Sequence, residues 1–348
     1  MAPVLVLNAG SSSLKARLLA ANGAIFWQGQ THWQASGDAA TVAVAVESAL
    51  TGWLWPAVEP WLADLALVGH RLVHGGTAFT APTALSGPVL AQLEALVPLA
   101  PLHLPPALAV IAGLARRRPH LSQWACFDTA FHATLPPEAH TYALPAAWRQ
   151  QGLRRFGFHG LNHQHVSETV ALPRLISCHL GAGCSLCAIA AGRSIATTMG
   201  FTPLEGLVMA TRSGSVDPGL LLHLLRQGVG LEELERGLNQ EGGLLGLSDG
   251  RSASMKELRQ AAERDEPAAR LAIDVFRHGL VQAIGAMAAS LGGVDGIALT
   301  GGIGEHDQLL RHELERSLSW LRPFELLVVP ADEEGVIARQ CRAAAGLL

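Results

Sequence analysis

The feature that most constrains this fold is a strand–turn–strand pattern that occurs twice. The first copy runs from an apolar stretch at 4–7, through a turn rich in Gly and Ser, to an alternating strand that begins at Leu14. The second runs from 175–180, through another turn of small residues, to 184–189, and it matches the first to within about one residue of register. Two matching hairpins so far apart favour duplicated α/β domains that face each other across a cleft.

The first turn, 8–13, is almost entirely small and hydroxylated. Gly10 allows a ligand to approach the backbone, Ser11 and Ser13 carry hydroxyl groups, and Lys15 adds a positive charge. Successive N–H groups in such a turn can form a concave nest that holds an anion such as phosphate. The alternative is a hairpin that binds nothing, since such turns are common.

Size and charge narrow the classes of function. The 348 residues suggest about two domains. A hydrophobic content of 49% with 16% charged residues is ample for large buried cores. The net charge of −4 gives no electrostatic footprint for nucleic acid or for an anionic membrane. We therefore expect neither nucleic acid nor a membrane as a partner.

The cysteine pattern indicates reduced thiols. The five cysteines are odd in number and lie mostly in apolar, strand-like stretches: Cys126, Cys178, Cys184, Cys187 and Cys341. Cys184 and Cys187 match the C-x-x-C spacing, but residues three apart in a strand face opposite sides, so a dithiol site is not expected.

Two long stretches with few charges, 72–93 and 95–115, are interrupted by prolines. Neither would cross a bilayer as a regular helix, and we expect a soluble, cytoplasmic protein.

Hydrophobic periodicity predicts the regular elements. Further strands are expected at 23–30, 65–68, 124–127, 296–300 and 326–329. Helices are expected at 39–50, 86–97, 107–116, 220–226, 231–239 and 268–291, with a rigid apolar loop at 100–106.

Several polar residues follow these strands in positions typical of ligand sites. Arg71 is expected just past a strand, in a Gly/His-rich loop, and Asp128 directly after a buried strand. His159 is flanked by glycines, which suits contact with a proton or a phosphate. The alternatives are a solvated loop arginine, a turn-capping aspartate and a packing histidine.

Three later segments are also candidates. Arg212 lies among small residues, where a structural loop arginine is the alternative. The strand at 296–300 leads into a loop with Gly301, Gly302 and Gly304, against which a nucleotide could lie. The acids at 332–334 could bind magnesium, or could simply begin a helix.

Other motifs point elsewhere or are missing. No P-loop is present, because neither Lys15 nor Lys256 follows a glycine, and the second turn lacks the third glycine of a dinucleotide fingerprint. The segment 246–250 matches G-x-S-x-G. A serine hydrolase using Ser248, with Asp295 and His306, is therefore the alternative from a different class.

Taken in order, the motifs resemble the acetate and propionate kinase family from Val4 to about Arg339. They include LNAGSSSLK at 7–15, GHRLVHGG at 69–76, APLH at 100–103, FDTAFH at 127–132, GFHG at 157–160, MGFTPLEG at 199–206 and GGIGE at 301–305. The acids at 332–334 and IAR at 337–339 complete the set.

The resemblance implies an actin-like (ribonuclease H-like) fold with two duplicated domains, a homodimer, and reversible, direct in-line phosphoryl transfer between ATP and acetate with Mg²⁺ or Mn²⁺. It implies an N-terminal domain at 1–145, on which a tail at about 328–348 packs back. A C-terminal domain at 146–327 would carry the nucleotide site and the dimer interface.

The resemblance also assigns roles by motif. Asn8 and Glu333 would position magnesium. The catalytic residues would be Arg71, Asp128, His159 and Arg212, with Val73, Leu102, Phe158 and Pro203 forming an apolar pocket for the methyl group. Nucleotide and phosphate groups would be bound by Ser11, Ser13, Lys15, His179, Gly181, Gly183, Gly301, Gly302 and Gly304.

The chain departs from the family pattern at several nucleotide contacts. Ala182 stands in place of a usual asparagine, Ala210 replaces a glycine, and Ser254-Met255-Lys256 replaces an Asp-apolar-Arg motif. Leu104, Ala107 and His306 replace asparagines, and the chain is shorter than typical members between Leu18 and Leu67 and after Gln308. These changes leave open GTP or pyrophosphate as donor. Propionate is the alternative acceptor, since a slightly wider pocket would suffice, and a third hypothesis is a non-catalytic relative that senses nucleotide or acyl phosphate.

Overall fold

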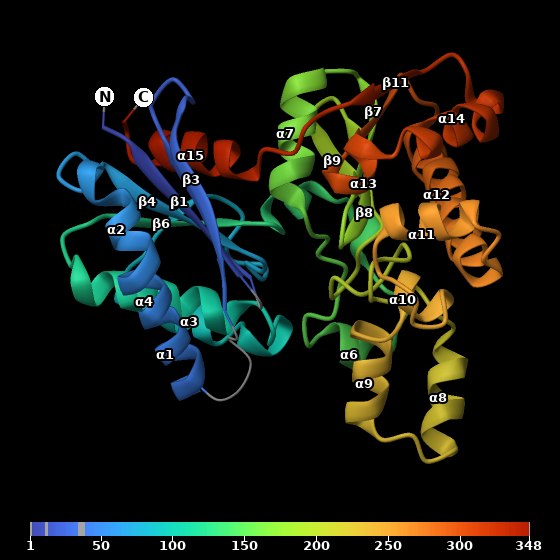
Figure 1. The fold of residues 1–348 in the computed structure, drawn as a ribbon, viewed down its shortest axis with the longest axis horizontal. Coiled ribbons are helices and arrows are strands. Elements are labelled where there is room, and N and C mark those ends of the chain that lie inside the picture. Colours follow the sequence, from blue (N-terminus) through green and yellow to red (C-terminus); the bar gives the residue numbers. More distant parts are fainter. Residues whose placement is uncertain (1, 11–12, 34–38, 348) are drawn as a thin grey trace. The chain divides into compact units, whose positions relative to one another are not determined.

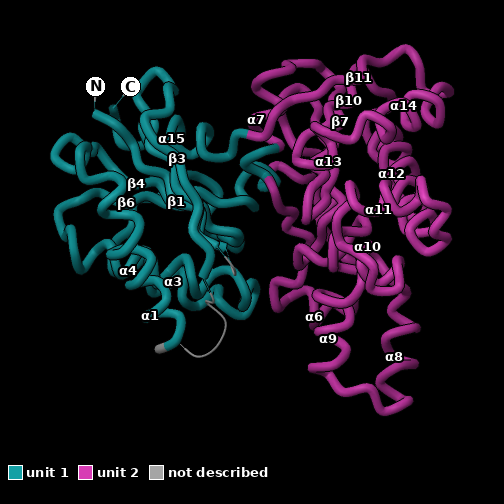
Figure 2. Tube along the Cα trace, in the orientation of Figure 1, with its two compact units in different colours: residues 1–133, 160–162, 332–348 teal, residues 134–159, 163–331 magenta. Residues whose placement is uncertain are grey.

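The computed structural model describes residues 2–10, 13–33 and 39–347. The chain folds into two compact units (Figure 2). Unit 1 comprises residues 1–133, 160–162 and 332–348, and unit 2 comprises 134–159 and 163–331. The chain therefore crosses from one unit to the other several times, and its C-terminal segment returns to unit 1.

Unit 1 is built on a six-stranded mixed sheet in the order β3-β2-β1-β4-β6-β5. The strands are β1 (Val4–Ala9), β2 (Ser13–Leu19), β3 (Ile25–His32), β4 (Leu67–Leu72), β5 (Thr83–Ala84) and β6 (Gln123–Phe127). β1, β2 and β3 form an antiparallel meander, whereas β4 pairs in parallel with both β1 and β6. The strands expected around 4–7, 14, 23–30 and 124–127 are confirmed.

Both faces of this sheet are covered (Figure 1). Leu5 and Leu7 point to a core formed with α1 (Ala39–Ala49) and α4 (Leu104–Arg117). Val4 and Val6 alternate to the other face and pack against α15 (Glu333–Ala344). This alternation is why β1 is apolar at every position from 4 to 7.

Short helical segments complete unit 1. These are α2 (Trp55–Val58), α3 (Gly87–Glu94), a π-helical turn (Leu50–Leu54) and 3₁₀ turns at Glu59–Trp61, Val97–Leu99 and Ala130–Thr134.

One helical stretch of the described residues, Thr41–Trp61, is long and apolar enough by length and composition to cross a membrane. Its inward-facing side chains, among them Val46, Leu50 and Leu54, belong to the core of unit 1. This stretch is neither of the two that the sequence analysis considered, 72–93 and 95–115.

Unit 2 repeats the same topology in a five-stranded sheet, in the order β11-β10-β7-β8-β9. Its strands are β7 (Arg174–Leu180), β8 (Cys184–Ala190), β9 (Arg193–Thr197), β10 (Gly296–Thr300) and β11 (Glu325–Val328). β7, β8 and β9 form an antiparallel meander, and β10 pairs in parallel with β7 and β11. Read from β9 to β11, the order and directions match β3-β2-β1-β4-β6, so the predicted duplication of an actin-like domain is confirmed.

The helices of unit 2 are numerous and mostly short. They are α5 (Pro137–His140), α6 (Ala146–Arg149), α7 (Gly160–Val170, whose first three residues belong to unit 1), α8 (Pro218–Arg226), α9 (Leu231–Asn239), α10 (Gly243–Leu247), α11 (Met255–Glu263), α12 (Pro267–Leu291), α13 (Gly301–His306) and α14 (Gln308–Ser317), with a 3₁₀ turn at Ser319–Leu321. The long helix α12 packs on β7, β8 and β9. Its buried face, with Ala272, Phe276, Leu280 and Ile284 four residues apart, explains that position.

Three sequence expectations are wrong at the level of local structure. Arg71 lies within β4, because pairing with β1 and β6 extends the strand through Gly and His residues that are weak strand formers. The expected apolar loop at 100–106 ends in helix, since α4 begins at Leu104 and its prolines occupy the first turn, where no N–H is needed. The glycines after β10 open the helix α13 instead of a loop.

Candidate active site

In unit 1, the predicted site residues of three parallel strands meet at one edge of the sheet. Asn8 near the end of β1 is in register with Arg71 of β4, and Asp128 directly follows β6. The guanidinium group of Arg71 donates from Nε to Asp128 Oδ1 at 2.9 Å and from Nη2 to Oδ2 at 2.6 Å. A third bond runs from Arg71 Nη1 to Asn8 Oδ1 at 3.3 Å. The solvated loop arginine and the simple turn cap are thereby excluded.

The two charges of this pair stabilise each other in a buried place. Asp128 is 1% exposed. Burial by itself would lower the pKa of Arg71, but the charge and hydrogen bonds of Asp128, with smaller contributions from Glu333 and Glu334, raise it above its ordinary value. Arg71 is therefore a fixed cation whose orientation is set by the fork of Asp128.

The acids at the start of α15 divide into two kinds. Asp332 caps the helix through Gly335 N and pairs with Arg17 at 2.6 Å, and Glu334 lies 3.5 Å from the same arginine. The side chain of Glu333 makes no ion pair or hydrogen bond within the part of the chain that the structure describes, while its charge contributes to the raised pKa of Arg71. The helix-start interpretation thus accounts for Asp332 and Glu334 but leaves Glu333 available for a ligand.

The oxygen donors in this part of unit 1 suit a hard cation. Asn8 supplies an amide oxygen, and Glu333 and Asp128 supply carboxylates. No group of three or more His, Cys, Asp or Glu residues among the described positions could hold a metal by itself. Mg²⁺ is commonly held by one or two carboxylates, with waters and substrate phosphates filling the other positions, so this sparse set fits it.

In unit 2, Arg212 is a half-buried cation that no carboxylate of the described residues pairs with. Its Nη1 donates to Pro203 O at 2.9 Å and lies 3.7 Å from Met209 Sδ. Burial lowers its pKa, and no carboxylate of the described residues forms an ion pair with it. Glu205, the acid of the 199–206 motif, is occupied by Arg155 and by Tyr142, each at 2.5 Å. A half-buried guanidinium that no carboxylate balances favours an anionic ligand.

The second small-residue turn lies directly against this arginine. A Cβ placed on Gly183 would be 3.2 Å from His159 Nε2 and 3.6 Å from Arg212 Nη1. The turn is tied to the arginine's own loop by a bond from Ala210 N to Ala182 O at 3.1 Å. A side chain at this position would crowd the imidazole, so the backbone of the turn, the imidazole and the guanidinium lie close together.

His159 holds an unusual backbone conformation. It precedes α7 with φ 56°, in the left-handed region that few residues other than glycine adopt. Its ring stacks on His179, at the end of β7, with centroids 4.3 Å apart. Its Nδ1 lies 2.9 Å from Ser185 Oγ. The imidazole is therefore held from its face and from one nitrogen.

The glycines after β10 serve different purposes. A Cβ on Gly301 would approach Leu180 O to 2.8 Å and one on Gly304 would lie 3.3 Å from Leu299 C, so both are needed for packing. Gly302 has open space around it, and its N lies 3.9 Å from a Cβ placed on Gly181. Of the three glycines, Gly302 is the one that could face a ligand alongside the second turn.

The remaining predicted residues that the structure describes, in the first turn and in the expected methyl pocket, do not form a site within either unit. Ser11 lies outside the described residues. In the first turn Gly10 N donates to Ser13 O at 2.8 Å, the counterpart of Gly181 N to Gly183 O at 3.0 Å. Lys15 is an exposed residue of β2. The four predicted pocket residues divide between the units, with Val73 and Leu102 in unit 1 and Phe158 and Pro203 in unit 2.

Two contacts were not foreseen from the sequence. The sequence analysis assigned no role to Ser185 or to His163. In the structure Ser185 Oγ lies 2.8 Å from His163 Nε2, and His163 Nδ1 lies 2.8 Å from Ser177 Oγ. The spacing of His159 and His163 could have placed both at the start of one helix, but their shared partner on β8 is a tertiary contact.

The serine-hydrolase alternative is wrong. Ser248 is 1% exposed at the end of α10, and its Oγ lies within hydrogen-bond distance of the carbonyl oxygens of Leu245 and Ser252, each at 3.1 Å. Asp295, the acid of the supposed triad, is paired with Arg174. A nucleophile elbow needs a strand before the serine, whereas here a helix precedes it.

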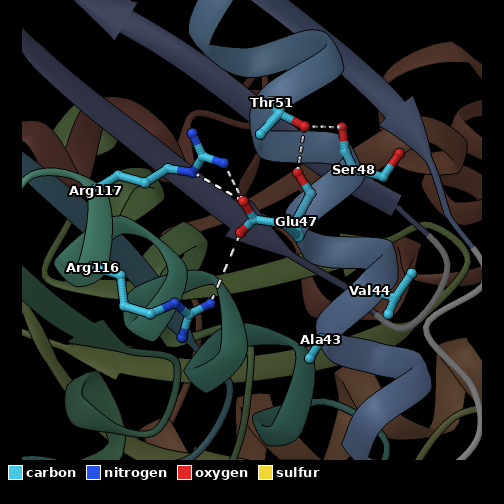
Figure 3. A pocket seen from close by; sticks show the side chains of 7 residues that line it. All are labelled: Ala43, Val44, Glu47, Ser48, Thr51, Arg116 and Arg117. Atoms are coloured by element: carbon cyan, nitrogen blue, oxygen red, sulfur yellow. Dashed lines mark hydrogen bonds and ion pairs between the residues drawn. The ribbon is translucent and has the colours of Figure 1, made fainter.

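A surface pocket of about 640 Å³ lies between α1 and α4 in unit 1 (Figure 3). Its charged residues satisfy one another, since Glu47 pairs with both Arg116 and Arg117. None of its lining residues is a predicted site residue, and we assign it no role.

A duplicated actin-like fold with half-buried arginines near its small-residue turns indicates a phosphotransferase. The match to known proteins is more specific: the model of the acetokinase family covers residues 3–340. The chain is 40% identical over 398 aligned positions to the acetate kinase of Synechococcus sp. (strain JA-2-3B'a(2-13)), covering 97% of this chain and 98% of that protein. The chain therefore belongs to the acetokinase family.

Solved structures agree with this assignment. The acetate kinase of Porphyromonas gingivalis superposes with a TM-score of 0.86 at 30% identity, covering 100% of both chains. A propionate kinase from Francisella tularensis subsp. tularensis SCHU S4 superposes with a TM-score of 0.89 at 30% identity, covering 98% of this chain and 99% of the other.

Proposed function

We propose that this protein transfers the γ-phosphoryl group of ATP to the carboxylate of acetate, giving acetyl phosphate and ADP reversibly. The observation that carries the proposal is Arg212, a half-buried cation without a carboxylate partner among the described residues, which lies beside Gly183 and the imidazole of His159. An anion of phosphoryl size would balance this charge. The names of the relatives at about 40% identity support acetate as the acceptor.

The residues of the chain would act mainly by position and charge. The phosphoryl group in flight carries its negative charge on three oxygens, so in-line placement and cationic neighbours are what the reaction needs. In the proposal Arg212 and His159 Nε2 contact that group, while Arg71, aligned by Asp128, holds the acetate carboxylate. Acetate is already ionised at neutral pH, so no general base is required.

We propose that Asn8 and Glu333 hold Mg²⁺, or Mn²⁺ in its place, with Asp128 close by. When bound, the ion would neutralise charge on the phosphates. Two observations support this proposal. These side chains offer oxygen ligands, and Arg17 pairs with Asp332 and Glu334 but not with Glu333.

For the nucleotide, we propose that the second turn (Gly181, Gly183), His179 and the α13 glycine Gly302 contact the phosphates in the part of the chain from 146 to 327. Ser11, Ser13 and Lys15 of the first turn, with Gly301 and Gly304, complete the proposed phosphate contacts. Ala182 is exposed and lacks the amide of the usual asparagine. GTP or pyrophosphate is accordingly the alternative donor.

For the acceptor, we propose that Val73, Leu102, Phe158 and Pro203 line the space for the methyl group. Propionate is the alternative substrate, because one of the similar structures is a propionate kinase and one methylene changes binding by only about 1–3 kcal/mol.

Steady-state kinetics test the assignment directly. Acyl hydroxamate formation should be fastest with acetate and ATP among the nine combinations of acetate, propionate and butyrate with ATP, GTP and pyrophosphate. No product with any combination would leave the sensor alternative, and a faster rate with propionate or with pyrophosphate would replace the substrate named here.

We further propose a homodimer formed through the part of unit 2 that holds α8 and α9. Neither helix has a buried residue, and Leu220, Leu222, Leu225 and Leu231 are 47%, 52%, 43% and 74% exposed. In Figure 1 both helices extend away from the sheet of their own unit. Light scattering should give twice the monomer mass, and Leu222→Glu with Leu225→Glu should reduce it to one.

We propose that the protein works in the cytoplasm. All five cysteines are buried and free, as expected for a reducing compartment, and the sequence analysis predicts neither a nucleic-acid nor a membrane partner.

A further inference from the structure

Behind His159 lies a chain of hydrogen bonds that runs into the core of unit 2. Ser185 Oγ is 2.9 Å from His159 Nδ1 and 2.8 Å from His163 Nε2. His163 Nδ1 is in turn 2.8 Å from Ser177 Oγ. His163, Ser177 and Ser185 are each 0% exposed, so the chain is shielded from water.

The single proton of the Ser185 hydroxyl couples the two histidines. A hydroxyl can donate to at most one of two nitrogens, and it accepts from any bonded nitrogen to which it does not donate. If His163 donates from Nε2, the Ser185 proton is left for His159 Nδ1, and a neutral His159 that accepts it carries its own proton on Nε2. If His163 instead donates from Nδ1, Ser185 donates to His163 and His159 must donate from Nδ1.

The surroundings of His159 select the first of these two arrangements. Its Nε2 and Arg212 Nη1 both lie within 4 Å of a Cβ placed on Gly183. The fixed charge of Arg212 disfavours a second positive charge on the imidazole. A neutral imidazole can donate toward that space only if its Nδ1 accepts, which requires a hydroxyl that donates to Nδ1.

We propose that Ser185 and His163 are positioning residues that hold His159 as the neutral Nε2–H tautomer, with this N–H directed at the phosphoryl group. The inference rests on the proposed role of His159. In this arrangement Ser177 donates to His163 Nδ1, His163 Nε2–H donates to Ser185, and Ser185 donates to His159 Nδ1. No proton leaves the chain during the reaction.

A double-mutant cycle between Ser185 and His159 tests the coupling. Ser185→Ala removes only the bridging oxygen, and we expect kcat to fall on the order of tenfold with the KM for ATP unchanged, since a misplaced donor weakens contact with the transition state. In a His159→Ala background the same change should have no further effect. A fall of equal size in both backgrounds would overturn the proposal.

The matched control is Ser194→Ala. Ser194 lies on the neighbouring strand β9, is also 0% exposed, and bonds to Cys187 Sγ at 3.2 Å. Its loss removes an equally buried hydroxyl that is not part of the chain, and kcat should stay within about twofold. Conservative rescue is also informative: His163→Gln keeps an N–H donor at the same reach and should retain more activity than His163→Leu.

A spectroscopic readout separates this proposal from the one it rests on. With ¹⁵N-labelled histidine, the His159 signals are those that vanish in His159→Ala, and they should report the Nε2–H tautomer in the unaltered protein. Ser185→Ala should shift them toward a mixture. Unshifted signals would refute the positioning role, whereas full turnover by His159→Ala would refute only the proposed contact of His159 with the phosphoryl group.

Discussion

Arg71 Nε and Nη2 donate to the two carboxylate oxygens of Asp128 at 2.9 and 2.6 Å, although the two residues lie 57 positions apart in the chain. Asp128 has almost no exposed surface. The carboxylate of Asp128 is therefore shielded from solvent. Its two hydrogen bonds fix the orientation of the Arg71 guanidinium group.

Removal of one partner should be costly both to stability and to activity. We expect Asp128→Asn to destabilise the protein by about 3 kcal/mol in urea unfolding, because it leaves the Arg71 charge uncompensated in a buried place. It should also lower kcat roughly 100-fold, as expected for a displaced charge at the reacting groups. The matched control is Asp295→Asn, since the Arg174–Asp295 pair has a similar fork but lies nearer the surface. If both variants shift the urea midpoint alike, burial does not decide the effect.

Removal of Arg212, unlike removal of the Asp128 charge, should not lower stability. Because no carboxylate of the described residues balances it, Arg212→Ala should leave the melting temperature unchanged or higher while kcat falls about 1000-fold. Arg259 provides the contrast, since it pairs with both Asp307 and Glu313. Arg259→Ala should lower the melting temperature with a much smaller effect on kcat. Turnover near the unaltered rate in Arg212→Ala would remove the central support for the proposed function.

Stability should fall in mild acid because of buried histidines. Burial lowers the pKa of His70 to about 4, despite a hydrogen bond to Gln123 that raises it. The unfolded chain takes up this proton near pH 6.5 and the folded chain only near pH 4, so stability is full above about pH 6.5 and decreases between these values. The contribution is about 3 kcal/mol for a shift of this size.

His70→Gln removes the titrating group and can keep the bond to Gln123. Its urea midpoint should therefore depend less on pH between 6.5 and 4 than that of the unaltered protein. His74, whose pKa is also lowered to about 4 by burial, stays in both proteins and gives them a common residual slope. Identical slopes would show that His70 takes up its proton as readily in the folded state as in the unfolded state, and would contradict the lowered pKa.

Restoring the family's usual residue in the second turn should strengthen nucleotide binding. Ala182 is exposed, so an asparagine fits there without displacing the bond from Ala210 N to Ala182 O. One hydrogen bond to a charged phosphate contributes about 1–3 kcal/mol, so Ala182→Asn should lower the KM for ATP at least about fivefold. Ala191→Asn is the control, because Ala191 occupies a left-handed turn position that asparagine tolerates. No change in KM for any donor would mean that this turn does not contact the nucleotide.

The five thiols should be unreactive in the folded protein. Burial raises the pKa of Cys184 and of Cys187 to about 12, and Cys126 lies 3.6 Å from Cys341 in the core of unit 1. Intact mass after treatment with iodoacetamide should show no adduct under native conditions and five in denaturant. An adduct in the folded state would reveal local opening at the modified cysteine.

The sequence by itself determined the duplication and most strands, because buried parallel strands are apolar at successive positions and small residues mark the turns. It also determined which polar residues follow strands, and Asp128 is where its pattern placed it. Local propensity failed where pairing dominates: Arg71 lies in a strand because β1 and β6 flank it, and the prolines of α4 suit a helix start that composition alone made look like a loop.

Only the tertiary structure decided how the charges are paired. The sequence contains three acids at 332–334, but Arg17, more than 300 positions away, binds two of them and leaves Glu333. The tertiary structure likewise brings Ser185 of β8 into contact with His159 and His163 at the start of α7. Such contacts depend on which strands and helices are brought together, and hydrogen bonds of about 3 Å between distant residues leave no periodic trace in the chain.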